Sequence, residues 1–455
     1  MTLKIEKIKK QVVDRYIKRT KKSKVHSEQA KQFLPGGDTR SIGYYKPYPV
    51  FGAKGKGCFL YDYDGNEYID FVNNMTSLVN GHAHPHVVEA LQKQIENGTA
   101  HGIPNEAQYQ LAELITKRIP GMDKVRFNNS VSEATLFSMR AARAYTGKDK
   151  FLKIDGGYHG CHDFAQVNLF PDLDSPDFPR PTIGKGVPAS VLQDILVMPY
   201  NNLEIAEKIL REKGGEIAAI ILEPLMGAGG GGLMAEQGYL KGLRKLADRY
   251  EVLLIFDEII TFRIHEGGWQ AMEGVEPDIT TLGKIIGGGL PVGAFGGREE
   301  IMSMFDPTRP ESVTHSGTFT GNPMTMAAGL ANLEIFGQKE IEQLNQLGEK
   351  FICDMNQTIK DCGIKGRLEG IGSVAVSRFS DRKVRSAKDA IMGFLEYGEF
   401  LQYLHLEMMN RGVYFLHRGL FNLSTPMTQD VLDKSVSEFG GAFEMLKPLS
   451  DAIGS

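Results

Sequence analysis

The lysine at position 284 lies in a setting that suggests chemistry. Apolar residues flank Lys284 in the chain, and three consecutive glycines follow at 287–289. A desolvated lysine amine is a nucleophile, and such lysines form Schiff bases with carbonyl groups. The glycines would let the backbone approach a bound group closely. We therefore favour a Schiff-base lysine over the alternative, a surface lysine that precedes a flexible turn.

An acidic residue occupies the end of a predicted strand. Residues 252–256 form an uninterrupted apolar run, and Asp257 and Glu258 come directly after it. The carboxylate of Asp257 is therefore expected at the rim of a sheet, half buried, where it requires a cationic partner. A protonated pyridinium nitrogen would meet this requirement. An acidic pair on the surface is the alternative.

Two further segments follow predicted strands and have features of a binding site. Residues 129–135 open a helix, so backbone N–H groups there could hold an anion, and Ser132 adds a hydroxyl. Residues 156–160 follow another strand, and Tyr158 could stack on a planar ring. Taken singly, each segment has a simpler interpretation, namely an ordinary helix N-cap with a capping box and a turn with an exposed aromatic side chain.

The four features occur in one chain and in a consistent order. An anion site, a stacking aromatic residue, a buried acid and a desolvated lysine follow one another, and the first three lie just beyond predicted strands. These are the parts that a pyridoxal 5'-phosphate (PLP) site requires. The sequence therefore predicts a PLP enzyme.

The elements that must position these residues alternate between helix and strand from about residue 76. The expected helices are 85–94, 106–118, 133–145 and 237–250, and the expected strands are 124–127, 151–154, 217–222 and 252–256. The last two strands are apolar without alternation, as in parallel strands buried on both faces. The fold class is therefore α/β with a mostly parallel sheet, in which ligands bind beyond the carboxyl ends of the strands.

The remaining segments predict a second, smaller unit. Residues 1–31 are expected to form a helix, and two strands at 58–63 and 67–71 are expected to flank a hairpin turn at Asp64-Gly65. Beyond residue 330 the pattern changes to long helices and short strands, which are expected at 339–362, 387–412, 372–377 and 412–416. We expect an N-terminal segment 1–75 that joins the small domain and dimer contacts, a large PLP-binding domain 76–330, and a C-terminal α+β domain 331–455.

The chain resembles the class III aminotransferases, a group of fold type I PLP enzymes, over nearly its whole length. Six segments carry the resemblance: 129–135, 156–160, Leu222-Glu223-Pro224, Phe256-Asp257-Glu258, 281–289, and Gly-Thr-Phe-Thr-Gly-Asn-Pro at 317–323. The chain looks closest to the glutamate-1-semialdehyde aminomutase branch, which also contains β-amino-acid (β-phenylalanine-type) aminotransferases. The resemblance implies the fold type I architecture, with a large mostly parallel sheet domain and a smaller α+β domain.

The resemblance also implies roles for individual residues. Lys284 matches the lysine that forms the Schiff base with PLP, and Asp257 matches the acid that pairs with the pyridine nitrogen. Tyr158 matches the aromatic residue that stacks on the ring, and Ile259 occupies the position of an aliphatic residue on the opposite ring face.

Three more positions match the phosphate contacts of the family. Val131 and Ser132 match a Gly-Ser/Thr pair, and Val131 replaces the glycine, which puts the backbone contact there in doubt. Thr318 matches a threonine that reaches the phosphate from the neighbouring subunit. The resemblance therefore implies a homodimer with shared active sites.

Two arginines are candidate binders of substrate carboxylates. Arg40 lies in the loop 35–49, where the β-amino-acid aminotransferases have an arginine, and Arg418 lies in His417-Arg418-Gly419. Arginine suits planar carboxylates because it binds them through two parallel hydrogen bonds; a surface salt bridge is the alternative for each. We expect an aminotransferase that acts on a β-amino acid, with aromatic β-amino acids as one candidate class, and on an oxo acid such as 2-oxoglutarate or pyruvate. The alternative is an aminomutase of the glutamate-1-semialdehyde 2,1-type.

Composition argues against several other classes. A net charge of -4 gives no attraction to nucleic acid or to an anionic membrane. The four cysteines are scattered without a CxxC pair, so we expect a reduced, cytoplasmic protein. We expect no membrane span, no signal peptide and no metal site in the histidine-rich segment 81–86. A catalytically silent relative is the alternative from another class, and the presence of both Lys284 and Asp257 argues against it.

Overall fold

The computed structural model describes residues 2–174, 179–227 and 229–453. The chain divides into two compact units, which we call unit 1 and unit 2. Unit 1 comprises Met1–His84, Gln343–Arg382 and Gly393–Ser455, and unit 2 comprises Pro85–Glu342 and Lys383–Met392. The boundaries expected from the sequence were 75/76 and 330/331. The second boundary lies later because α12 (Pro323–Glu334) packs on α4 (Pro85–Glu96) and α5 (Glu106–Arg118) of unit 2.

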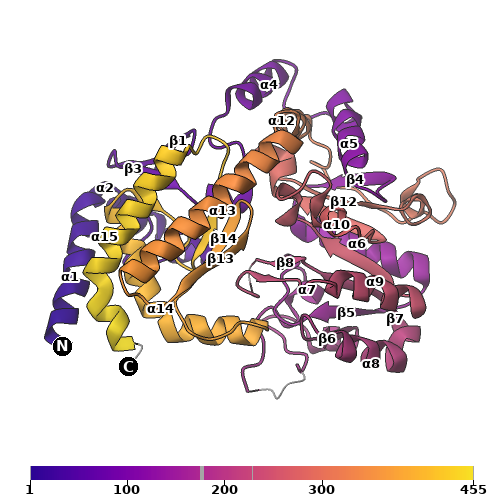
Figure 1. Ribbon diagram of the computed structural model, residues 1–455. Coiled ribbons are helices and arrows are strands. Elements are labelled where there is room, and N and C mark those ends of the chain that lie inside the picture. Colours follow the sequence, from indigo (N-terminus) through magenta and orange to yellow (C-terminus); the bar gives the residue numbers. More distant parts are fainter. Residues whose placement is uncertain (1, 175–178, 228, 454–455) are drawn as a thin grey trace. The chain divides into compact units, whose positions relative to one another are not determined.

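Unit 2 is built on a seven-stranded mixed sheet in the order β4-β12-β11-β10-β7-β5-β6 (Figure 1). The strands are β4 (Lys124–Asn128), β5 (Lys150–Ile154), β6 (Ile195–Met198), β7 (Ile217–Leu222), β10 (Leu253–Asp257), β11 (Ile279–Gly283) and β12 (Gly293–Gly297). The pairs β6–β5, β5–β7, β7–β10 and β10–β11 are parallel, and β12 is antiparallel to both its neighbours. The expected α/β class with a mostly parallel sheet is confirmed.

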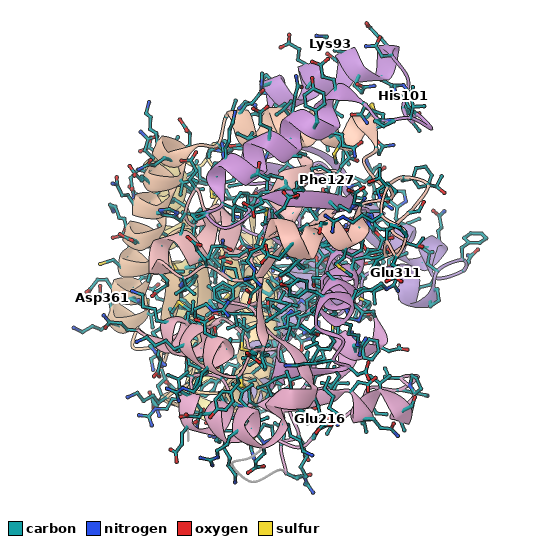
Figure 2. All side chains as sticks on the ribbon, turned by 90° about the vertical axis from the view of Figure 1, so that its right-hand side faces the viewer. Lys93, His101, Phe127, Glu216, Glu311 and Asp361 are labelled. Atoms are coloured by element: carbon teal, nitrogen blue, oxygen red, sulfur yellow. The ribbon has the colours of Figure 1, made fainter. Side chains whose placement is uncertain are left out.

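Helices and side chains enclose this sheet. Every residue of β7 and β10 is buried, which explains why neither strand alternates in polarity. Besides α4, α5 and α12, the helices of unit 2 are α6 (Val131–Thr146), α7 (Asp163–Gln166), α8 (Leu203–Lys213), α9 (Tyr239–Arg249), α10 (Gly268–Glu273) and α11 (Glu299–Met302). Helix α6 packs on β11 and β12, and α9 packs on β10. Phe127 of β4 is buried, whereas Lys93, Glu216 and Glu311 are exposed, and Figure 2 shows Lys93 at the upper edge of the molecule.

Unit 1 contains two small sheets and long helices. The order β1-β2-β3-β15 joins β1 (Gly52–Lys56), β2 (Phe59–Asp62), β3 (Glu67–Asp70) and β15 (Val413–Tyr414), and the order β13-β14-β16 joins β13 (Arg367–Ile371), β14 (Val374–Arg378) and β16 (Leu420–Asn422). The helices are α1 (Thr2–Arg19), α2 (Lys21–Ala30), the single turn α3 (Asn73–Thr76) and α15 (Gln429–Ile453). Helices α13 (Gln338–Asp361) and α14 (Ala387–Asn410) begin in unit 2 and continue into unit 1.

The expected hairpin between the strands at 58–63 and 67–71 is present, because β2 and β3 pair antiparallel. The single helix expected over residues 1–31 is wrong in one respect. Thr20 leaves the helical conformation with φ -121° and separates α1 from α2. Its hydroxyl donates to the Tyr16 carbonyl at 2.7 Å, so the side chain satisfies a carbonyl at the end of α1. Among the described residues, no helix has the length and apolar character that crossing a membrane requires.

Candidate active site

The carboxyl ends of four neighbouring parallel strands meet at one edge of the unit 2 sheet. Strands β5, β7, β10 and β11 run in the same direction, so the residues that follow them share that edge. Lys284 follows β11, Asp257 ends β10, Glu223 follows β7, and the turn 156–160 follows β5. The topology therefore brings together three of the features that the sequence placed far apart.

Lys284 is held in an unusual backbone conformation directly after β11. Its φ is +51°, in the left-handed region that non-glycine residues rarely occupy. Such a conformation costs about 1–3 kcal/mol and persists only where the surroundings enforce it. Burial lowers the pKa of the Lys284 amine, and the nearby carboxylates of Asp257 and Glu223 oppose this change. The amine is therefore more easily deprotonated than an exposed lysine.

Asp257 is buried beside Lys284. Its side chain is 3% exposed, burial raises the pKa of its carboxyl, and the Lys284 amine acts in the opposite direction. One carboxylate oxygen accepts a hydrogen bond from the backbone N–H of Ile259 at 3.3 Å. The other lies 2.7 Å from Nδ1 of His159. Burial lowers the pKa of His159 to about 3, so the imidazole is neutral near pH 7 and its Nδ1–H donates to Asp257.

Sequence reasoning missed His159, although it is adjacent to Tyr158 in the chain. Its role depends on burial and on the 2.7 Å contact with Asp257, which lies 98 positions away. The adjacent Tyr158 is partly buried, and its hydroxyl lies 3.6 Å from the thiol sulfur of Cys161. The signal that could have found His159 is its place beside an aromatic residue at a strand's carboxyl end.

The start of α6 presents backbone N–H groups that the helix itself leaves unpaired. Ser130 caps the helix and forms a capping box with Glu133, so Val131 and Ser132 occupy the first two helical positions. Backbone N–H groups at these positions have no partner within the helix. The hydroxyl oxygen of Ser132 accepts from the N–H of Cys161 at 2.9 Å, which leaves its own O–H able to donate to an anion. A Cβ atom on Gly160 would lie 2.5 Å from the Ser132 Cα, so only glycine allows this approach.

The side chain of Val131 is directed at the strand that carries Lys284. A Cβ atom on Gly283 would lie 2.7 Å from Val131 Cγ2 and 3.7 Å from Ile259 Cγ1. Val131 and the buried Ile259 therefore both border the residue that precedes Lys284. The Val131 side chain thus puts a methyl group near Gly283, and its residue forms the first position of α6.

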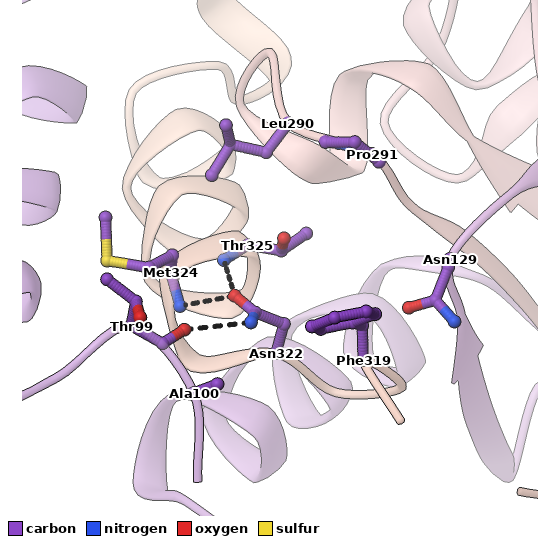
Figure 3. Close-up of a pocket in the computed structure, with 9 residues that line it drawn as sticks. All are labelled: Thr99, Ala100, Asn129, Leu290, Pro291, Phe319, Asn322, Met324 and Thr325. Atoms are coloured by element: carbon purple, nitrogen blue, oxygen red, sulfur yellow. Dashed lines mark hydrogen bonds between the residues drawn. The ribbon is translucent and has the colours of Figure 1, made fainter. Parts of the chain in front are cut away.

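Thr318 lies in an exposed turn. A Cβ atom on the preceding Gly317 would lie 3.3 Å from Nδ2 of Asn129, which stands just before α6. The turn is closed by a hydrogen bond from the Thr320 N–H to the Gly317 carbonyl at 3.1 Å. Beside it is a pocket lined by Thr99, Ala100, Asn129, Leu290, Pro291, Phe319, Asn322, Met324 and Thr325 (Figure 3). Asn322 fixes one wall, because its side chain accepts from the Met324 and Thr325 N–H groups and donates to the Thr99 carbonyl. Neither Lys284 nor Asp257 lines this pocket, and only Asn129 connects it to the start of α6.

The two candidate arginines belong to unit 1. Arg40 is exposed and donates to the Asn74 side-chain oxygen at 2.7 Å. It is close enough to Tyr414 to oppose the effect of burial on the pKa of that phenol. Arg418 is exposed as a residue. Protein atoms around its guanidinium nevertheless exclude part of the water, and this desolvation lowers the pKa of Arg418. Among the described residues, neither arginine forms an ion pair with a carboxylate.

Tyrosine and histidine rings lie near both arginines. The ring of Tyr45 lies 4.3 Å from that of His405 and 6.3 Å from that of His417, measured between centroids. His417 directly precedes Arg418, and Tyr45 also acts on the pKa of Tyr414, which Arg40 influences. Unit 1 therefore contains a group of largely buried aromatic rings and two arginines that, among the described residues, have no protein carboxylate as a partner.

The model of the family "Aminotransferase class-III" matches residues 43–426. The chain belongs to the class III aminotransferases. This family consists of enzymes that depend on PLP, and the chain shares its fold type I architecture. The resemblance expected from the sequence is confirmed.

Three similar proteins place this class III aminotransferase more closely. The glutamate-1-semialdehyde 2,1-aminomutase of Syntrophobacter fumaroxidans is 39% identical, over 93% of this chain and 97% of that protein. An ω-transaminase structure from Sphaerobacter thermophilus is 38% identical with a TM-score of 0.90, over 93% of this chain and 98% of that one. A β-phenylalanine aminotransferase structure from Variovorax paradoxus is 33% identical with a TM-score of 0.88, over 98% and 99%. The relatives compared by sequence bear the aminomutase name, which supports that alternative better than the β-amino-acid interpretation.

Proposed function

We propose that this class III aminotransferase binds PLP through Lys284 and transfers an amino group from an amino acid to an oxo acid. The observation that carries the proposal is the grouping of Lys284, Asp257 and His159 at one sheet edge, where α6 also begins. A desolvated amine, a buried carboxylate and an anion cradle are the groups that a phosphorylated pyridine aldehyde requires.

The side chains fit the cofactor part by part. Ser132 and the N–H groups at the start of α6, including that of Val131, would hold the phosphate. Asp257 would pair with the protonated ring nitrogen, which supplies the cationic partner that a buried carboxylate needs. Tyr158 and Ile259 would cover the two faces of the ring. Lys284 would hold the cofactor covalently.

Side chains of the site would move or hold the protons on the substrate carbon and on the cofactor's ring nitrogen. When bound, the cofactor withdraws electrons from the carbon that carries the amino group. The Lys284 amine, whose pKa is lowered by burial, can remove a proton from that carbon and return it elsewhere. His159 donates to Asp257 and so favours the ionised carboxylate, which in turn keeps the ring nitrogen protonated.

We further propose that Arg40 and Arg418 hold substrate carboxylates. A β-amino acid and an oxo acid such as 2-oxoglutarate or pyruvate carry their carboxylates at different distances from the reacting carbon. Two arginines can serve these two geometries in turn, and we assign Arg40 to the β-amino acid and Arg418 to the oxo acid. The aromatic rings near them suit an aromatic amino donor.

An aminomutase is the second candidate, and the names of the relatives favour it. Such an enzyme moves an amino group within one substrate, so it needs no separate oxo acid. The deciding experiment measures amino exchange between β-phenylalanine and 2-oxoglutarate or pyruvate. In parallel, glutamate-1-semialdehyde is supplied without an oxo acid. Exchange in the first assay supports the aminotransferase, and isomerisation in the second assay alone supports the aminomutase.

The two arginines can be separated by kinetics. Losing a hydrogen-bonded charge partner costs roughly 2–5 kcal/mol, so each truncation should raise the apparent KM of one substrate far more than that of the other. Arg40→Ala should act mainly on the amino donor and Arg418→Ala mainly on the oxo acid. Steady-state kinetics with each substrate varied separately provide the measurement. Unchanged constants in both variants would remove the arginines from the site and favour the aminomutase.

A further inference from the structure

A second buried lysine lies beneath the candidate site. Lys153 is on β5, its residue is 1% exposed, and its ammonium group donates to the Gly157 carbonyl at 2.6 Å. Burial lowers the pKa of Lys153 to about 8, and the carboxylates of Glu223 and Asp155 oppose this change. A buried ammonium is costly unless nearby groups compensate it. The mechanism above gives Lys153 no role.

Glu223 contacts the same turn with the opposite charge. One of its carboxylate oxygens accepts from the Tyr158 N–H at 2.8 Å, and the other accepts from the Gly227 N–H at 3.1 Å. Glu223 is 5% exposed, so this carboxylate is also buried.

The two contacts involve a single peptide group. The Gly157 carbonyl and the Tyr158 N–H belong to the peptide bond that joins these residues, and that group is planar. Lys153 therefore places a cation at the negative end of the peptide dipole, and Glu223 places an anion at its positive end. This arrangement favours one orientation of the peptide plane and opposes its flip. The plane sets the directions in which the next two side chains, Tyr158 and His159, leave the backbone.

His159 connects this peptide to Asp257. Its Nδ1 lies 2.7 Å from the carboxylate, and its buried Nε2 has no hydrogen-bond partner among the described residues. A Cβ atom on Gly157 would lie 3.1 Å from this Nε2 and 3.7 Å from the Lys153 ammonium, so the two groups border the same space. A cation there disfavours a proton on Nε2, so the neutral imidazole carries its proton on Nδ1, which donates to Asp257.

We propose that Lys153 and Glu223 are positioning residues that fix the Gly157–Tyr158 peptide by opposite charges, so that Tyr158 meets the cofactor ring and His159 stays bonded to Asp257. The inference rests on the proposed function, because it assumes that Tyr158 and Asp257 contact PLP. The Lys153 ammonium then supplies a second cation, which keeps its positive charge while Lys284 gains and loses a proton. Lys153 thereby keeps the neighbouring carboxylates ionised throughout the reaction.

Titratable groups from several elements surround this pair, and all of them enter the expected pH dependence. They are Asp155 after β5, His159 and His162 in the following loop, Glu223 after β7, Asp257 and Glu258 at β10, and Lys284 after β11. Removing a cation from such a cluster raises the pKa of the remaining carboxyls, and removing an anion lowers it.

The test compares Lys153→Met, Glu223→Gln and the control Lys150→Met in the PLP-loaded enzyme. Lys150 lies on the same strand and pairs with Glu216 at the surface. The visible circular dichroism of bound PLP is followed as the pH is lowered. We expect both site variants to lose kcat by roughly 10-fold to 100-fold, because a small misplacement of reacting groups has effects of that size. The control should behave as the wild type.

The acid midpoint is the pH at which half of the PLP signal is lost as the pH is lowered. The direction in which it shifts distinguishes positioning by charge from a general loss of structure. Lys153→Met should move the midpoint of the PLP signal to higher pH by about one unit, and Glu223→Gln should move it to lower pH. A midpoint that stays in place in both variants, or moves in the same direction in both, overturns the proposal. If Lys153→Met does not fold, Glu223→Gln alone decides by the sign of its shift. Failure of the proposed function would appear separately, as PLP bound through a lysine other than Lys284.

Discussion

At the scale of single residues, the candidate site depends on titratable groups that are buried close together. Burial is the first cause of the pKa shifts of Asp257, His159 and Lys284. The second cause is the Lys284 amine for Asp257, the Asp257 carboxylate for Lys284, and the Lys153 ammonium for His159. Groups that are perturbed in this way gather at functional sites, because catalysis requires protonation states that water would not favour. Substitutions of these residues therefore test the proposed active site.

Asp257→Asn should preserve the fold and strongly reduce turnover. An amide fills the same volume, but it carries no charge to keep the cofactor's ring nitrogen protonated. We expect a loss on the order of 10²-fold or more in kcat, which corresponds to several kcal/mol in the barrier. Steady-state kinetics provide the measurement, with thermal unfolding as the check on folding. A variant within a few-fold of the wild type would contradict the role of Asp257.

At the scale of elements, the start of α6 carries two serines with different tasks. Ser130 caps the helix through its contact with the Glu133 N–H at 3.2 Å, and Ser132 is the proposed phosphate ligand. Ser132→Ala should raise the Kd of PLP by roughly 10-fold to 100-fold, because a hydrogen bond to a charged group contributes about 1.5–3 kcal/mol. Ser130→Ala is the matched control and should lower stability by about 1 kcal/mol. Equal PLP affinity in Ser132→Ala and the wild type would exclude Ser132 as a ligand.

The strands that end at the site were partly predictable. Strands β7 and β10 were expected from their apolar runs, because parallel strands buried on both faces need no alternation. Strand β12 was missed because three of its five residues are glycine, and glycine is depleted in strands. Glycine is required there by a tertiary contact. A Cβ atom on Gly293 would lie 2.0 Å from the Ser130 carbonyl oxygen, because the strand passes close to the start of α6.

Tertiary contacts, which the local sequence does not reveal, also explain which site residues were missed. Lys284 and Asp257 could be found because each follows apolar residues in the chain itself. Lys153 and His159 were missed, since their burial arises from elements distant in sequence, and only the position of His159 beside Tyr158 at a strand's carboxyl end is visible in the chain itself. Local polarity alone describes both as ordinary charged or polar residues.

At the scale of the whole molecule, Thr318 is expected to complete the site of a second copy. Mixing Lys284→Ala with Thr318→Ala should then restore activity, because one site of each heterodimer would receive both intact residues. The mixture is measured against each variant alone, with sedimentation as the measure of assembly. Full activity in a monomer, or no recovery in a heterodimer shown to form, would contradict the shared site.

Chemical trapping can identify the lysine that holds the cofactor, which we propose is Lys284. Borohydride reduction fixes PLP permanently to the lysine that binds it, and peptide mass mapping then identifies that residue. We expect the label on Lys284 alone, and Lys284→Ala should take up no label and show no turnover. The second buried lysine, Lys153, is the internal comparison because it lies in the same unit and is also desolvated. A label on Lys153 or on any other lysine in the wild-type enzyme would contradict the account.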